Sequence, residues 1–127
     1  MVRFEVTGET TFHASHHLIH YRGTSETPHE HNYRLNVVLE VDRLDYDDIS
    51  VDFIELDRIL NAIKAHFDNC NINEITELSG KNSTAENLAL TIGDMLNVEL
   101  NNAKNTRLKC VEIWELSNMS VRVCFDP

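Results

Sequence analysis

The sequence has few cysteines. Its 127 residues contain Cys70, Cys110 and Cys124, an odd number with no Cys-x-x-Cys pair and no spacing typical of a disulfide framework. A small domain stapled by disulfides is therefore excluded, and we expect reduced thiols in a reducing compartment.

Long apolar runs are also absent. No stretch approaches the roughly 20 apolar residues that span a bilayer, and the opening residues, MVRFEVTGETTF, lack the apolar segment of a signal peptide. Hydrophobic residues make up 42% and charged residues 25% of the chain, which is typical of a folded globular protein. We expect one soluble, cytoplasmic domain covering residues 1–127, without a membrane partner.

Basic residues are scarce. Eleven Lys and Arg stand against 21 Asp and Glu, so the formal net charge is −10. A surface of this average sign repels the phosphate backbone of nucleic acids. Nucleic-acid binding is therefore disfavoured.

Hydrophobic periodicity predicts strands at both ends of the chain and helices between them. Period-two alternation and β-rich composition indicate strands at 3–16, 29–42, 106–116 and 119–125. Helical spacing runs from Phe53 to Phe67 and again from Ser83 to Leu100. The simplest fold class is α+β, a four-stranded antiparallel sheet with two helices inserted between its second and third strands and packed on one face.

Two capping boxes are expected at the helix starts. Asp52 with Glu55 fits the first helix, and Ser83 with Glu86 fits the second. On this interpretation Glu86 belongs to a helix cap and not to a binding site.

Histidines form the sharpest pattern in the sequence. His29 and His31 lie two residues apart on a predicted strand, so both imidazoles project from the same face. A third ligand on the neighbouring strand would complete a Zn²⁺ site with an open position, as in catalytic zinc centres. Parity favours His16, which lies on the inward face, whereas a bulge near residue 15 would favour His17.

Six ordered segments of the chain form one pattern. They are Phe12-His13-Ala14-Ser15-His16-His17-Leu18, His29-Glu30-His31-Asn32-Tyr33, Val51-Asp52-Phe53, Asp68-Asn69, Ser83-Thr84-Ala85-Glu86-Asn87-Leu88-Ala89 and Trp114-Glu115. The set covers nearly the whole chain and is more specific than any one of its members. In this order the segments resemble the 6-pyruvoyltetrahydropterin synthase and 6-carboxytetrahydropterin synthase family.

The resemblance implies a tunnelling fold, in which three chains join their sheets into a barrel and two trimers stack into a hexamer. It implies Zn²⁺ on His16, His29 and His31, and 7,8-dihydroneopterin triphosphate as substrate. It further implies that Glu115 binds the pterin ring, that the Thr84 hydroxyl assists, and that Asp68 takes part in catalysis.

The chain departs from the family pattern in the loop before His29. Most members carry a cysteine there as the base, whereas this loop contains Glu26, which resembles the glutamate of the type III members. Type III members cleave the substrate to 6-hydroxymethyl-7,8-dihydropterin for folate synthesis. The resemblance therefore implies a lyase with Glu26 as general base.

Two other positions also differ. Asn69 replaces the histidine of an Asp-His pair, and an amide cannot relay a proton at neutral pH. His66 is a candidate substitute, although a surface role fits it as well. Glu30 replaces a glycine between the two histidines, and we expect its side chain to point away from the metal.

Two alternatives remain open. The first is a different reaction of the same family, that of a 6-carboxytetrahydropterin synthase of the queuosine pathway or of a 6-pyruvoyltetrahydropterin synthase. The missing loop cysteine disfavours both reactions. The second is a zinc- and pterin-binding module without turnover, which the Asn69 departure favours.

Overall fold

The computed structural model describes residues 2–101, 103 and 105–127. Strands near the two ends of the chain flank a helical middle, in the predicted order. The elements are β1 (Phe4–His16), β2 (His29–Val41), α1 (Phe53–Phe67), β3 (Cys70–Asn71), the short 3-10 helices η1 (Ile72–Glu74) and η2 (Thr76–Leu78), α2 (Ala85–Glu99), β4 (Thr106–Leu116) and β5 (Met119–Cys124).

The sheet has five strands in the order β3-β1-β2-β4-β5, one more than the four predicted. The four long strands pair antiparallel, as expected. The additional strand β3 pairs parallel to β1 through Ala14 and Cys70 and through Ser15 and Asn71. A strand of two residues has no periodicity, so the sequence pattern could not reveal it.

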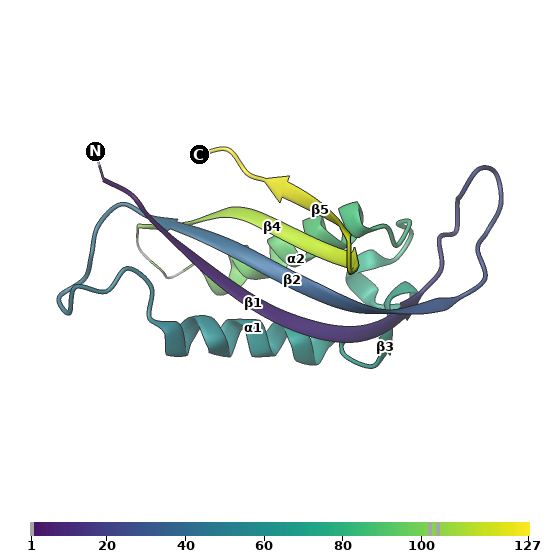
Figure 1. Cartoon of the computed structure of the whole chain (residues 1–127), viewed down its shortest axis with the longest axis horizontal. Helices are drawn as coiled ribbons and strands as arrows, with labels where there is room; N and C mark the ends of the chain where they lie inside the picture. The colour runs from purple at the N-terminus through teal and green to yellow at the C-terminus, as the bar shows by residue number, and fades with distance from the viewer. Residues whose placement is uncertain (1, 102, 104) are drawn as a thin grey trace.

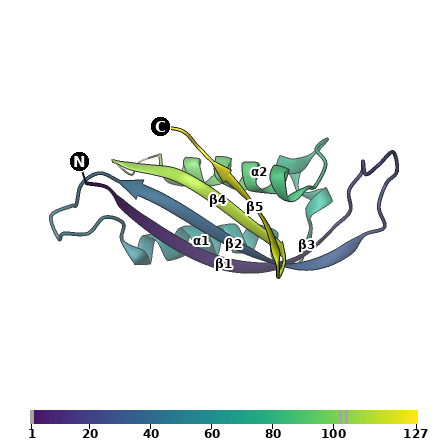
Figure 2. The same cartoon turned by 45° about the horizontal axis from the view of Figure 1, so that its top comes forward.

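Both helices cover the same face of the sheet (Figures 1 and 2). The buried side of β1 carries Val6, Phe12 and Ala14, and α1 and α2 bury their apolar stripes against the sheet. Phe12 stacks between Tyr33 and Phe67, with ring centroids 5.1 Å and 5.4 Å away. In the described part of the chain, no helix is both long and apolar enough to cross a membrane.

The helix starts correct the predicted caps. Asp52 caps α1, because its side chain accepts a hydrogen bond from the Ile54 N–H. Glu55 instead pairs with Arg58, so the second half of that capping box does not form. The N-cap of α2 is Thr84 and not Ser83, since the Thr84 hydroxyl accepts from the Asn87 N–H. Ser83 is therefore available for another role.

The connection between β1 and β2, residues 17–28, extends beyond the end of the sheet (Figure 1) and is called the arm below. Tyr21 and Thr24 bridge its tip. The turn between them uses positive φ angles at Arg22 (49°) and Gly23 (83°), and glycine adopts such angles without steric cost. This arm carries Glu26.

At Gly8, side chains of α1 pack close against the backbone of β1. A Cβ atom there would lie 2.8 Å from Leu60 Cδ1 and 3.0 Å from Leu56 Cδ2. We expect Gly8→Val to lower the free energy of unfolding by about 1–3 kcal/mol through overpacking. The control is Thr7→Val, which adds the same side chain on the exposed face of β1. Urea unfolding measures both, and equal stabilities would contradict this packing.

Candidate metal centre

Three histidines converge where β1 ends and β2 begins. The β1–β2 register is regular throughout, without a bulge, and pairs His16 directly with His29. His31 lies two residues further along β2 on the same face, and the three ring centroids are 4.6–5.1 Å apart. His16 is buried, with 2% of its surface exposed, and His29 and His31 are partly buried. The absence of a bulge keeps His17 out of this group.

Backbone carbonyls fix the tautomers of two of these imidazoles. His16 Nδ1 lies 2.8 Å from the Ser83 carbonyl oxygen, and His29 Nδ1 lies 3.0 Å from the Thr27 carbonyl oxygen. Because a carbonyl only accepts, each Nδ1 carries the proton in the neutral ring. Each Nε2 therefore carries a free lone pair, and the two Nε2 atoms lie 3.1 Å apart.

His31 supplies the third nitrogen. Its Nε2 is buried and has no hydrogen-bond partner. Burial lowers the pKa of His31 below its usual range, which favours the neutral form that binds metals. One ligand atom from each of the three histidines lies within 4.8 Å of the others. Three imidazoles clustered in this way suit a divalent transition metal with an open coordination position.

A cavity of about 250 Å³ opens beside the histidines. Its walls come from the strand ends, the arm, the start of α2 and the β4–β5 hairpin. Glu26, Glu86 and Glu115 line it, whereas no Lys or Arg does so among the described residues. The other lining residues are His16, Leu18, His29, Thr84, Ala85, Ile113, Leu116, Met119, Ser120 and Val121.

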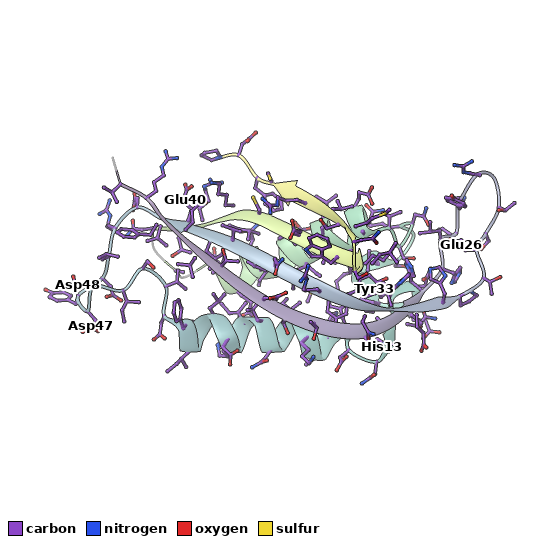
Figure 3. The ribbon with its side chains drawn as sticks, viewed as in Figure 1. His13, Glu26, Tyr33, Glu40, Asp47 and Asp48 are labelled. Carbon is purple, nitrogen blue, oxygen red and sulfur yellow. The ribbon has the colours of Figure 1, made fainter. Side chains whose placement is uncertain are left out.

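Both glutamates predicted for the site reach this cavity. Glu115, from β4, places Oε1 3.4 Å from His16 Nε2. Glu26 lies on the arm beyond the strand ends (Figure 3), and its Oε1 accepts a hydrogen bond of 2.9 Å from the Leu18 N–H. Burial, and then the charge of Glu115, raise the pKa of Tyr33 beneath the histidines, so its phenol stays neutral.

Asp68 does not line the cavity of its own chain. Its side chain accepts from the His13 N–H at 2.9 Å, at the junction of α1 and β3. Asn69 follows with a φ of 59°, a conformation that asparagine tolerates well, and its N–H donates to the His13 carbonyl. His66 contacts Glu77 at 3.1 Å, also outside the cavity.

Sequence reasoning missed Ser83 and excluded Glu86. Ser83 is buried, its carbonyl orients His16, and its hydroxyl donates to the His17 carbonyl at 2.9 Å. The Ser-x-x-Glu pattern suggested a helix cap, but α2 begins one residue later, so Glu86 lines the cavity. A hydrogen bond to a backbone carbonyl does not depend on the side chain of that residue, so the sequence pattern does not reveal it.

Glu30 lies on the opposite face of the strand from the three histidines, as predicted. Its carboxylate is exposed and lies 3.5 Å from His13 Nε2. The substitution of glutamate for glycine at this position therefore leaves the three-histidine cluster undisturbed.

The chain has the fold of the tetrahydropterin synthases. The 6-pyruvoyl tetrahydropterin synthase of Caenorhabditis elegans superposes with a TM-score of 0.83 at 21% identity, covering 99% of this chain and 98% of that one. The Plasmodium vivax enzyme gives 0.77 at 20%, with coverages of 97% and 98%. The Plasmodium falciparum enzyme gives 0.73 at 18%, with coverages of 95% and 96%.

Sequence comparison assigns the family. Residues 5–124 match the family described as 6-pyruvoyl tetrahydropterin synthase, and the chain belongs to this family. Comparison with curated proteins gives no match. Membership supports a lyase-type enzyme with a tetrahydropterin synthase-type function, and the three-histidine cluster fits its metal dependence.

We expect the protein purified without chelators to hold about one divalent metal ion per chain. His16→Ala should lose it, whereas His17→Ala should keep it, because His17 lies outside the cluster. Acidification should release the metal, since a protonated imidazole has no lone pair to offer. Elemental analysis measures all three, and full occupancy in His16→Ala would contradict the site.

Proposed function

We propose that the protein is a zinc-dependent lyase that cleaves the side chain of 7,8-dihydroneopterin triphosphate to give 6-hydroxymethyl-7,8-dihydropterin. The observation that carries this proposal is the shared cavity: Glu26 lines it together with His16 and Glu115. A base, a metal centre and an acceptor for the pterin ring thus face one volume. A folate-branch product follows from a carboxylate base in a loop without cysteine.

Zinc is the metal we propose for His16, His29 and His31. Neutral imidazoles suit Zn²⁺, and three protein ligands leave a position for substrate. When bound there, Zn²⁺ would act as a Lewis acid that lowers the pKa of the hydroxyls on the side chain of the substrate. The carbonyls of Ser83 and Thr27 hold two of the rings with Nε2 toward the site.

Glu115 is proposed to bind the pterin ring. Its carboxylate is partly exposed to the cavity, and a carboxylate accepts two parallel N–H bonds from a guanidine-like ring edge. Thr84 lines the same wall. Its hydroxyl already accepts from the Asn87 N–H, which leaves its own proton free to donate to substrate.

Glu26 is proposed as the general base. The Leu18 N–H donates to one of its oxygens and holds the carboxylate at the cavity. There the carboxylate can take a proton from a hydroxyl on the side chain of the substrate. A relative supports a glutamate in this role. Two structures of the Plasmodium vivax enzyme, 19% identical to this chain, are described as catalytic residue mutants in which a glutamate is replaced by cysteine or alanine.

Asp68 is proposed to act on the cavity of a neighbouring copy. It does not line the cavity of its own chain, and it lies two residues before β3, the edge strand of the sheet. Edge strands present unpaired backbone groups to another chain. Trimers that join their sheets at such edges, stacked as a hexamer, would bring Asp68 to a second site.

A non-catalytic zinc- and pterin-binding module is the second candidate. Asn69 favours it, because an amide cannot relay a proton and His66 lies outside the cavity. The 6-carboxy and 6-pyruvoyl reactions remain alternative products, disfavoured by the arm, which contains no cysteine.

Removing the basicity of Glu26 should abolish most turnover. Glu26→Gln keeps the size and the oxygen that accepts from Leu18, and loss of a general base typically costs about 10²–10⁴-fold in rate. Zinc content and pterin affinity should change little. Ser25→Ala is the adjacent control and should retain activity. Turnover that survives Glu26→Gln would remove this residue from the mechanism.

Product identity separates the candidate functions. Mass spectrometry after incubation with 7,8-dihydroneopterin triphosphate should detect 6-hydroxymethyl-7,8-dihydropterin. Asn69→His should leave this activity equal or raise it, because histidine also tolerates positive φ. Formation of 6-carboxytetrahydropterin alone would assign the alternative reaction, and no product would assign the binding module.

Assembly tests the proposed role of Asp68. A five-stranded sheet with two open edges and a modest core predicts a trimer or hexamer in solution. Light scattering at micromolar concentration measures the mass. A stable, zinc-loaded monomer would contradict the shared site.

A further inference from the structure

Two asparagine side chains hold the first residues of the arm. Asn73 Oδ1 accepts from the His17 N–H at 2.9 Å, and Asn73 Nδ2 donates to the His17 carbonyl at 2.9 Å. Asn82 Oδ1 accepts from the Ile19 N–H at 2.8 Å, and Asn82 Nδ2 donates to the His20 carbonyl at 2.8 Å. Each amide thus uses both a donor and an acceptor on the arm's backbone, as a neighbouring strand would.

The arm needs such partners because its strand pairing has ended. The β1–β2 ladder stops at His16 and His29. Buried backbone N–H and C=O groups are costly without hydrogen bonds. A side-chain amide has the same donor and acceptor chemistry as a peptide group, so two asparagines continue the ladder where no strand is available.

These bonds reach Glu26 through Leu18. Leu18 lies between the clamped residues His17 and Ile19; its N–H donates to Glu26 Oε1, and its carbonyl accepts from the Glu26 N–H, both at 2.9 Å. The position of Leu18 therefore sets the position of the Glu26 carboxylate.

The clamp also meets the metal centre. The Ser83 hydroxyl oxygen lies 2.9 Å from the His17 carbonyl oxygen and 3.1 Å from Asn73 Oδ1. The Ser83 carbonyl accepts from His16. Residues 73–83 thus hold one metal ligand and the base-bearing arm together.

We propose that Asn73 and Asn82 are positioning residues that place Glu26 at the cavity by clamping the backbone of residues 17–20. This role rests on the proposed function of Glu26 as the base. Neither asparagine lines the cavity, so neither is a catalytic residue.

Asn82→Ala tests the clamp on the intact, metal-loaded protein. Amide hydrogen exchange should become faster at Ile19, which loses its acceptor, and at Leu18, whose bond to Glu26 loosens. The kcat for product formation should fall by up to about 10²-fold, the scale of a slightly misplaced group, with little change in KM or metal content. Asn82→Asp keeps the acceptor oxygen, so Ile19 should stay protected and kcat should be intermediate.

Asn61→Ala, on the exposed face of α1, is the matched control and should change none of these values. Unchanged exchange at Ile19 and Leu18 in Asn82→Ala would overturn the clamp. Faster exchange with an unchanged kcat would overturn its positioning role. If even the wild type yields no product, the proposed function fails, while the Leu18 exchange still decides whether Asn82 holds Glu26.

A separate observation concerns the thiols of Cys110 and Cys124. These residues are direct partners in the antiparallel β4–β5 pair, and their Sγ atoms lie 3.2 Å apart. Opposed residues in such pairs have Cα separations of roughly 4.5–5.5 Å, within the range of disulfides. Cys124 is exposed, whereas Cys110 is buried.

We infer that this pair is an oxidation site whose oxidant is a small-molecule disulfide such as oxidised glutathione. The Cys124 thiolate attacks one sulfur of the oxidant, whose S–S bond breaks, and the departing thiolate takes up a proton. The deprotonated Cys110 sulfur then attacks Cys124 Sγ and displaces the second small thiol. Two protein thiols become one disulfide while one small disulfide is reduced to two thiols.

The bond would tie the edge strand β5 to β4. Met119 and Val121 of this hairpin line the same cavity as His16 and His29. The linkage also closes a loop in the unfolded chain, which lowers its entropy. We therefore expect the oxidised protein to unfold at a higher temperature than the reduced protein.

Incubation of the Cys70→Ser variant with oxidised glutathione tests the site. Mass spectrometry of the intact protein should show the loss of two hydrogen atoms without a glutathione adduct, and Cys124→Ser in that background should prevent this change. A glutathione adduct that persists on Cys124, or two thiols that remain open to alkylation, would overturn the inference.

Discussion

The pairing of His16 with His29 is the contact on which the rest of the site depends. Their Nδ1 protons are committed to the carbonyls of Ser83 and Thr27, so two lone pairs face each other at 3.1 Å. Such an arrangement is unfavourable without a cation between the nitrogens. The fold nevertheless holds it in place, with the unpartnered Nε2 of His31 beside it. This arrangement of all three rings fits a metal centre.

The cavity beside this centre has an acidic lining. Three carboxylates line the cavity, and no basic side chain lines it among the described residues. In the proposed function, the positive charge beside Glu115 and Glu26 comes from the metal or from a neighbouring copy in the assembly. This arrangement fits the proposed roles, in which Glu115 binds the N–H edge of the pterin ring and Glu26 takes a proton from a substrate hydroxyl. The segment from Asn73 to Ser83 positions both the metal ligand and the arm, which couples the two halves of the site.

Strand parity made the three histidines predictable. Residues two apart share a face, and the regular register then placed His16 opposite His29. Ser83 was not predictable, because its backbone carbonyl binds His16, a residue far away in sequence. Its position three residues before Glu86 also fits a capping box, although Thr84 is the N-cap. The strand β3 was too short for any pattern to show. Asp68 matched a motif by position, but motifs do not say which chain's cavity a residue faces, and within one chain it binds the His13 N–H.

X-ray absorption spectroscopy at the metal edge tests the central claim most directly, because it counts the ligands without requiring turnover. For the zinc-loaded protein we predict three imidazole nitrogens at about 2.0–2.1 Å and one further light atom in an open, four-coordinate site. A sulfur scatterer at about 2.3 Å, or fewer than three imidazoles, would contradict the claim that His16, His29 and His31 form the metal centre.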